Sequence, residues 1–591
     1  MLHELVAYAD KHLADSEPGF KTREVRWSIE LAADGRFLNI LPLGDGKRGA
    51  DLPRCPDMHG MNAGGKSHFL VETAQTVVLF FKTNEEDKKI EGARIKHRFY
   101  TQLLRDAAQT CPQLDMLADI LESDSRCDEI RAALATQKAK PSDWVTWRID
   151  GRDPRLHTEV QAWWRNWRRG DQDGDSTAPQ STKDAASTDR EMMLCLLTGL
   201  PAKPLPTHPK ITGLSGVGGL ATGDVMVGFD KAAFGSYGLD QSANAAMSEE
   251  AVQKYVDGLN DLIRNHTRKL GNALVAYWYK HSLPPEDDPL AFLVEMETAE
   301  QSEAAALGAA RRLLDAIRAG MRPELADNHY YALTLSGAAG RVMVRDWMEG
   351  AFEDLVSHIT GWFTDLQIVA RDGNGNARDP KFMAVCGALV RDLKDLPAPT
   401  AATLWKVAVQ GLPIPQPLMA QALARFRADL VDKDQPAFNH ARMGLIKAYF
   451  IRRKPGGDTT MTAYLNHEHP ESAYHCGRLL AVLAELQYAA LGDVGAGVVQ
   501  RYYAAASQAP GLILGRLVRN AQFHLNKPDK PWLGSKYEKP MMEIAARLKD
   551  EFPQTLDLKG QGLFALGYYQ QLAQLRAGNQ STTDNTNQQG A

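Results

Sequence analysis

The chain contains 591 residues, of which 44% are apolar and 24% are charged, with 11 Trp and 17 Tyr. This composition is ordinary for a folded globular protein of roughly two to four domains, and it excludes a fibrous or wholly disordered chain. The 68 basic and 73 acidic side chains give a net charge of −5, so any contact with nucleic acid must come from local basic patches.

Cysteine spacing and hydropathy indicate a cytoplasmic protein with no membrane partner. The six cysteines lie far apart and include no C-x-x-C pair, which favours reduced thiols over a disulfide framework or a zinc site. The opening MLHELVAYADKHLADSE is charged throughout, and no run of about 18 apolar residues occurs anywhere in the chain. We therefore expect a cytoplasmic location.

The first 191 residues mix helical and strand patterns. After a short amphipathic helix, EVRWSIEL and FLNILPL flank the turn AADGR and predict a β-hairpin. ARIKHRFYTQLLRDAAQ and EVQAWWRNWRR have helical spacing, and DWVTWRI between them alternates as a strand. Residues 168–191 have almost no apolar content and predict a flexible insertion. We assign 1–191 to a mixed α/β N-terminal domain.

Residues 60–67, GMNAGGKS, match the P-loop pattern G-x-x-x-x-G-K-[ST]. A P-loop requires a buried strand immediately before it and a helix N-terminus after it, whose N–H groups hold phosphate. Residues 46–65 contain no periodic apolar run and predict a long loop instead. The missing strand argues against ATP binding, and a flexible loop with Asn62, Gly64, Gly65, Lys66 and Ser67 remains.

From about residue 192 to residue 375 we expect a second domain of Gly-rich loops, strands and helices. Ser248 is a suitable N-cap for a helix whose apolar face includes Val252, Tyr255 and Leu259. YYALTLSGAAGRVMVRDW predicts a pair of strands around a Gly turn, and RDGNGNARDP at 371–380 is rich in turn residues.

Beyond that point the chain has Ala- and Leu-rich helical patterns, such as GRLLAVLAELQYAAL. We predict a C-terminal α-helical bundle over 376–578 and a disordered polar tail over 579–591. The fold class is therefore α+β, with a mixed α/β N-terminal region containing irregular Gly-rich loops and a helical C-terminal region.

Neither a catalytic nor a metal-binding constellation stands out. His467, Glu468 and His469, with His475 and Cys476 nearby, lack the spacing of a zinc site, so a structural role is favoured. Four basic clusters are more suggestive, because Arg and Lys beside aromatic rings can hold phosphates and stack on bases. Each cluster alone is more often a solvated surface: Lys88, Lys89, Arg94, Lys96, His97 and Arg98; Arg148, Arg152 and Arg155; Arg165, Arg168 and Arg169 beside Trp163, Trp164 and Trp167; and Lys447, Arg452, Arg453 and Lys454.

Three segments, in this order, closely resemble the large subunit of the type I-C Cascade complex, the Csd family of CRISPR-associated proteins: CLLTGLPAKPLPTHPKITGLSG, FGSYGLDQSANAAMSEEAVQKYVDGLNDLI and YYALTLSGAAGRVMVRDW. The opening LHELVAYADKHL and the later GGKSHFLVETAQTVVLF also look like this family. The resemblance spans most of the chain, and SYGLDQSANAAMSEEA is its most specific part.

The resemblance implies a non-catalytic subunit, without a cofactor, at one end of a crRNA-guided surveillance complex. It would recognise the PAM in double-stranded DNA, assist R-loop formation, hold the displaced strand and recruit a helicase-nuclease, while base pairing with the crRNA reads the target sequence. Its other partners would be the backbone and crRNA-processing subunits and small subunits made from an internal start. Met461 is favoured over Met443 as that start, which makes the region from about 461 small-subunit-like.

On this resemblance, two loops are candidates for contact with PAM-proximal DNA: Asn62, Gly64, Gly65, Lys66 and Ser67 in the first, and Gly238, Gln241, Ser242 and Asn244 in the second. The candidates for phosphate contacts are Lys88, Lys89, Arg94, Lys96, Arg452, Arg453 and Lys454. Two other functions remain open: a P-loop-like ATP-binding enzyme and a purely structural scaffold subunit.

Overall fold

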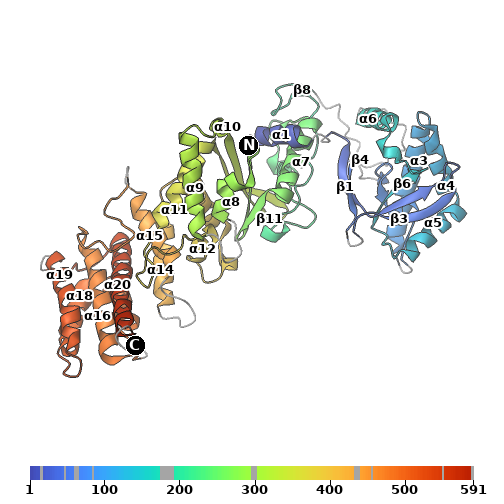
Figure 1. Cartoon of the computed structure of the whole chain (residues 1–591). Helices are drawn as coiled ribbons and strands as arrows, with labels where there is room; N and C mark the ends of the chain where they lie inside the picture. Colours follow the sequence, from blue (N-terminus) through green and yellow to red (C-terminus); the bar gives the residue numbers. More distant parts are fainter. Residues whose placement is uncertain are drawn as a thin grey trace. The chain divides into compact units, whose positions relative to one another are not determined.

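The computed structural model describes the whole chain except residues 14–16, 46–47, 59–64, 83–84, 173–191, 295–302, 431–438, 454–456, 495, 549–550 and 588–591. Its contacts divide the chain into two compact units, and many of their elements are labelled in Figure 1. Unit 1 comprises Met1–Gly213, Leu220–Arg264 and Ala339–Val342. Unit 2 comprises Leu214–Gly219, Asn265–Ala338 and Met343–Ala591.

Unit 1 contains a mixed sheet covered by helices. Its elements are α1 (Leu2–His12), β1 (Phe20–Val25), β2 (Trp27–Leu31), β3 (Phe37–Pro42), β4 (Ala50–Pro56), β5 (Glu72–Thr73), α2 (Ala74–Val77), α3 (Asp87–Ala108), α4 (Asp115–Glu122), α5 (Asp124–Thr136), β6 (Trp144–Ile149), α6 (Thr158–Gln172), β7 (Met193–Leu194), β8 (Pro201–Ala202) and α7 (Glu249–Asn265).

The main sheet of unit 1 has the strand order β3-β2-β6-β5. Strands β2 and β3 form the predicted antiparallel hairpin, and β6 pairs parallel to β2, with Ile29 opposite Trp147. Side chains of α3, α4 and α5 share one buried core with this sheet, and the Trp147 indole donates a hydrogen bond of 2.9 Å to the Tyr100 hydroxyl. The predicted helices at α3 and α6 and the predicted strand at β6 are confirmed.

The prediction of an uninterrupted loop over 46–65 is wrong, because Ala50–Pro56 forms strand β4 antiparallel to β1. Pro53 and Pro56 argue against a strand when only the sequence is considered, since proline lacks the N–H that a central strand needs. They are tolerated here because Pro53 lies in an irregularity of the pairing, between the paired residues Leu52 and Cys55, and Pro56 ends the strand.

The Gly-rich segment that precedes α7 is irregular. Over residues 213–245, all of which are described, the chain forms 3₁₀ turns and isolated bridges, and Val225 bridges to Arg341 at the tip of a hairpin. The predicted N-cap of α7 is confirmed, because the Ser248 hydroxyl accepts a hydrogen bond of 3.3 Å from the Ala251 N–H.

Unit 2 consists of a four-stranded sheet and a long series of helices. Its elements are β9 (Thr267–Leu270), β10 (Ala273–Tyr279), α8 (Pro289–Val294), α9 (Glu303–Arg318), α10 (Pro323–Ala326), β11 (His329–Ala338), β12 (Arg341–Ala351), α11 (Phe352–Leu366), α12 (Phe382–Gly387), α13 (Ala398–Val409), α14 (Gln416–Asp429), α15 (His440–Ile451), α16 (Ser472–Leu491), α17 (Val498–Ala506), α18 (Pro510–Leu525), α19 (Trp532–Arg547) and α20 (Leu558–Asn587).

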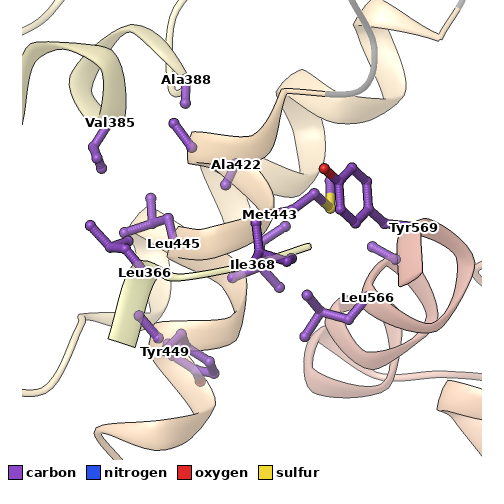
Figure 2. Close-up of a cluster of buried hydrophobic side chains, with 14 of the residues drawn as sticks. Leu366, Ile368, Val385, Ala388, Ala422, Met443, Leu445, Tyr449, Leu566 and Tyr569 are labelled. Atoms are coloured by element: carbon purple, nitrogen blue, oxygen red, sulfur yellow. The ribbon is translucent and has the colours of Figure 1, made fainter. Parts of the chain in front are cut away.

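One continuous core runs through unit 2. The sheet has the order β12-β11-β10-β9, in which β11 and β12 are the predicted strand pair. Buried side chains from β9 to α20 belong to a single cluster. Figure 2 shows the part of this core where α15, carrying Met443 and Leu445, meets Ala422 of α14 and Leu566 and Tyr569 of α20.

The fold class is confirmed, because a mixed α/β N-terminal region with sheets precedes a largely helical C-terminal region. The division into domains 1–191, 192–375 and 376–578 stays a prediction, although the core of unit 2 continues across residue 376. Helix α20 extends to Asn587, past residue 579 where we placed the start of a tail. In the described part of the chain, no helix is long and apolar enough to cross a membrane.

Candidate nucleic-acid interface

Gly65, at the end of the first candidate loop, lies against helix α3. Gly65 has φ +93°, and a Cβ placed on it would come within 2.5 Å of Ile95 Cγ2, so both the backbone and the packing require glycine. Lys66 follows it and is partly exposed, whereas Ser67 is fully buried and is not placed to meet a ligand. Asn62 and Gly64 lie outside the described residues.

This geometry does not form a P-loop, even though β4 precedes it. Over residues 66–73, all of which are described, no helix begins, and the chain enters β5 before α2 starts at Ala74. A P-loop holds phosphate with the N–H groups of a helix that begins at its Lys-Ser pair. The described residues after Gly65 therefore lack the feature that would bind a nucleotide phosphate.

The basic residues of α3 are on its surface. Lys88, Lys89 and Arg94 are exposed and Lys96 is partly exposed. Lys89 lies 3.2 Å from Glu85, and Arg94 lies 3.9 Å from Glu91. Such exposed pairs are weak and exchange readily with another anion. Ile95, which contacts Gly65, lies between Arg94 and Lys96 in the sequence of α3.

The second candidate loop is built around Asn244. Its side-chain oxygen accepts a hydrogen bond of 2.9 Å from Ser236 N, and its amide nitrogen donates to the carbonyls of Leu239 and Gln241, each at 2.9 Å. These bonds use both donors of the amide and one of its acceptor positions. Asn244 therefore holds the loop in shape, and the sequence-based expectation that it reads a base is not supported by its contacts.

The same loop holds other residues in left-handed backbone conformations. Tyr237, Gly238 and Gln241 have φ values of 53°, 72° and 47°. This region costs a residue with a Cβ about 1–2 kcal/mol, and such strain persists only where the surroundings enforce it. Gln241 is exposed, whereas Ser242 is 1% exposed and lies inside the loop.

Tyr237 is a candidate that the sequence patterns did not single out. Its side chain is 99% exposed, at a strained position of a loop that Asn244 braces. A large aromatic ring held fully in water contributes nothing to the core and can stack on a base or insert between base pairs. The sequence feature that could have identified Tyr237 is its position between Ser236 and Gly238, within the most specific segment of the family resemblance.

The aromatic residues of α6, with Arg165 and Arg168, make contacts within the fold. Trp164 stacks on Trp167 with ring centroids 5.3 Å apart and on Phe69 at 5.5 Å. Arg165 pairs with Glu17 at 2.5 Å and Arg168 pairs with Glu249 at 2.5 Å. The cluster joins α6 to neighbouring segments, so it is not an open surface for unpaired bases.

Arg452 is also occupied inside its unit. Its guanidinium pairs with Asp365 at 2.7 Å, lies 5.3 Å above the Trp362 ring and is 6% exposed, and burial lowers its pKa. We therefore no longer expect it to hold a phosphate. Arg453 is exposed and donates a hydrogen bond to the Tyr449 hydroxyl, and Lys454 lies outside the described residues.

The histidines near α16 form a structural network. His475 is 1% exposed, its Nε2 donates to the His469 carbonyl at 2.6 Å, and its Nδ1 accepts from Arg478 at 3.1 Å. Burial and the neighbouring guanidinium lower the pKa of His475 to about 4. Among the described residues, no group of His, Cys, Asp and Glu has the arrangement of a metal site.

The family model for "CRISPR-associated protein (Cas_Csd1)" matches residues 5–576. The match covers both compact units and nearly the whole chain. A search of curated proteins finds no match.

Proposed function

The chain belongs to the Csd1 family of CRISPR-associated proteins and is the large subunit of a type I-C Cascade complex; from this premise we propose that it recognises the PAM and begins opening the target duplex. Pairing between crRNA and target reads the sequence in such complexes, so the protein has only a short DNA element to read. The remaining question is which surface reads it.

The observation that carries the proposal is the braced loop 236–244 of unit 1. Asn244 bonds to three backbone positions of this loop, and Tyr237 and Gln241 are exposed side chains of the loop at strained backbone positions. A glutamine amide can bond to base edges in a groove, and an aromatic ring can unstack a base step. A rigid loop with these two side chains is suited to reading a short duplex and starting its separation.

The α3 surface supplies the complementary electrostatic contact. Lys88, Lys89, Arg94 and Lys96 lie on one helix, and Lys66 follows Gly65, which contacts Ile95 of the same helix. Contacts of this kind bind the DNA backbone without regard to sequence and set its position. In this proposal, phosphate contacts at α3 position the DNA and base contacts at 236–244 read its sequence, so two parts of unit 1 take part in binding.

The helical part of unit 2 has a separate role in this proposal. We infer that α16–α20 form the small-subunit-like region, because Met461 lies in the connection between α15 and α16 and leaves all five helices intact. Met443 lies within α15 instead, after the residue that caps it. Cleavage of the target would belong to the recruited helicase-nuclease, so this subunit needs no catalytic site of its own.

Binding of target DNA to the assembled complex tests the proposal against its alternatives. The complex is titrated with duplexes that carry a matched PAM, selected from a randomised library, or an altered PAM, each with and without ATP. We expect tighter binding to the matched PAM and no effect of ATP. Equal affinity for both duplexes would indicate a scaffold, and a dependence on ATP that Lys66→Ala abolishes would indicate a P-loop enzyme.

A further inference from the structure

A buried polar cluster joins the two ends of the first candidate loop. Asp57 precedes the loop and His68 follows it, and His68 Nδ1 lies 3.0 Å from Asp57 Oδ1. The same ring nitrogen accepts a hydrogen bond of 3.0 Å from Met58 N. Both side chains are less than one-tenth exposed, at 8% for Asp57 and 7% for His68. The cluster therefore holds together the chain at Asp57 and Met58 and the chain at His68.

Arg23 of β1 is the third member of the cluster. Its guanidinium pairs with Asp57, and Nη2 lies 3.1 Å from His68 Nε2. The guanidinium also lies 4.1 Å above the ring of Trp144 in β6. Since β1 and β6 belong to the sheets of unit 1, the loop ends are connected to regular structure rather than to another loop.

The residues that follow the loop are held in place on both sides of Lys66. Gly65 packs against Ile95 of α3, Ser67 is fully buried, and His68 N donates to Glu72 Oε2 at 3.1 Å. Lys66 lies between these fixed residues and is partly exposed. Its neighbours in the chain are packed or buried, so a contact made by its ammonium group requires little further ordering of the backbone.

We propose that Arg23, Asp57 and His68 are positioning residues for Lys66, which they hold beside the basic surface of α3 for contact with a DNA phosphate. The inference rests on the proposed function, because it names residues that support one of its phosphate contacts. It differs from a general stabilising role in one respect. The effect of the cluster on DNA binding passes through Lys66 and vanishes when Lys66 is removed.

A double-mutant cycle in the assembled complex tests this dependence. His68→Gln, Lys66→Ala and the double variant are compared for affinity and for the salt dependence of target-DNA binding. A lost phosphate contact lowers the salt slope by about one and weakens binding to all sequences. We expect both single variants to show this loss, and the double variant to bind no more weakly than Lys66→Ala alone.

Arg105→Gln is a matched control, because Arg105 joins an ion cluster with Asp115, Asp119 and Glu122 near the other end of α3. It should leave the affinity and the salt slope unchanged. If His68→Gln lowers the thermal unfolding midpoint of the chain so far that binding cannot be measured, Arg23→Lys replaces it in the cycle, since it keeps the charge opposite Asp57.

Additive losses from the two single variants would overturn the inference, as would an unchanged affinity of either single variant. The proposed function fails by a different result, namely equal affinity of the unaltered complex for matched and altered PAM. The cycle measures sequence-independent contacts, so the two failures are distinguishable.

Discussion

Gln241 and Lys88 are both exposed, but they suit different contacts with a duplex. The glutamine amide can bond to base edges, whereas the lysine ammonium is suited to phosphates. We expect Gln241→Ala to lower affinity by about 1–3 kcal/mol, and only for the matched PAM, because a lost base contact affects only the cognate sequence. Lys88→Ala should weaken binding to every sequence and lower the salt slope by about one. Titrations of both variants at several salt concentrations measure this. Uniform losses from Gln241→Ala would exclude it as a base reader.

His475 predicts a pH dependence of stability. Burial, together with Arg478, lowers its pKa from 6.5 to about 4, so the unfolded chain binds the proton more tightly than the folded chain. Stability from this group is complete above pH 6.5 and falls as pH decreases toward 4. Fully expressed, such a shift corresponds to about 3 kcal/mol.

Denaturant unfolding at pH 7 and pH 4.5 measures this effect by comparing the unaltered chain with His475→Gln. The amide keeps a donor and an acceptor but does not titrate in this range. The variant should therefore lose less stability than the unaltered chain on acidification. An equal loss in both proteins would assign the acid sensitivity to other groups.

Helices α16 and α20 approach each other through glycines. A Cβ built on Gly477 would overlap the Phe564 carbonyl oxygen, and one on Gly567 would overlap the Tyr474 carbonyl oxygen. Gly477→Ala should therefore force the helices apart and destabilise the chain by about 1–3 kcal/mol, as overpacking does in other cores.

Gly515 supplies the control for this substitution. It lies in α18, and nothing is within 4 Å of a Cβ placed there, so Gly515→Ala should gain up to about 1 kcal/mol from helix propensity. Denaturant unfolding of both variants gives the comparison. Stabilisation by Gly477→Ala would show that the close approach of α16 and α20 is not required.

The spacing of apolar residues was sufficient to predict the helices and strands that bury one regular face. The hairpin β2–β3, helix α7 and the strand pair β11–β12 were predicted this way. Strand β4 was missed because its two prolines break the pattern, and only pairing with β1, distant in sequence, reveals it. The contacts of Asn244 within its loop were not predicted, for a related reason. Its value for base reading depends on whether its amide is already bonded within the loop, which no sequence pattern shows.

At the scale of the whole molecule, the C-terminal helices α16–α20 are a candidate for a part that folds alone. A fragment that starts at Met461 contains α16–α20, whose buried faces pack on one another. We expect this fragment to be helical by circular dichroism and to unfold cooperatively with urea. A fragment without a cooperative transition would show that the bundle depends on α14 and α15, and would argue against Met461 as an internal start.

Photo-crosslinking from the PAM tests the central claim that unit 1 reads this element. A photoreactive base is placed in the PAM of a matched duplex bound to the assembled complex, and the crosslinked peptides are identified by mass spectrometry. We expect adducts within residues 236–244 and on the loop and helix around Lys66 and Arg94, and loss of the 236–244 adduct when the PAM is altered. Adducts confined to unit 2 or to another subunit would contradict the account.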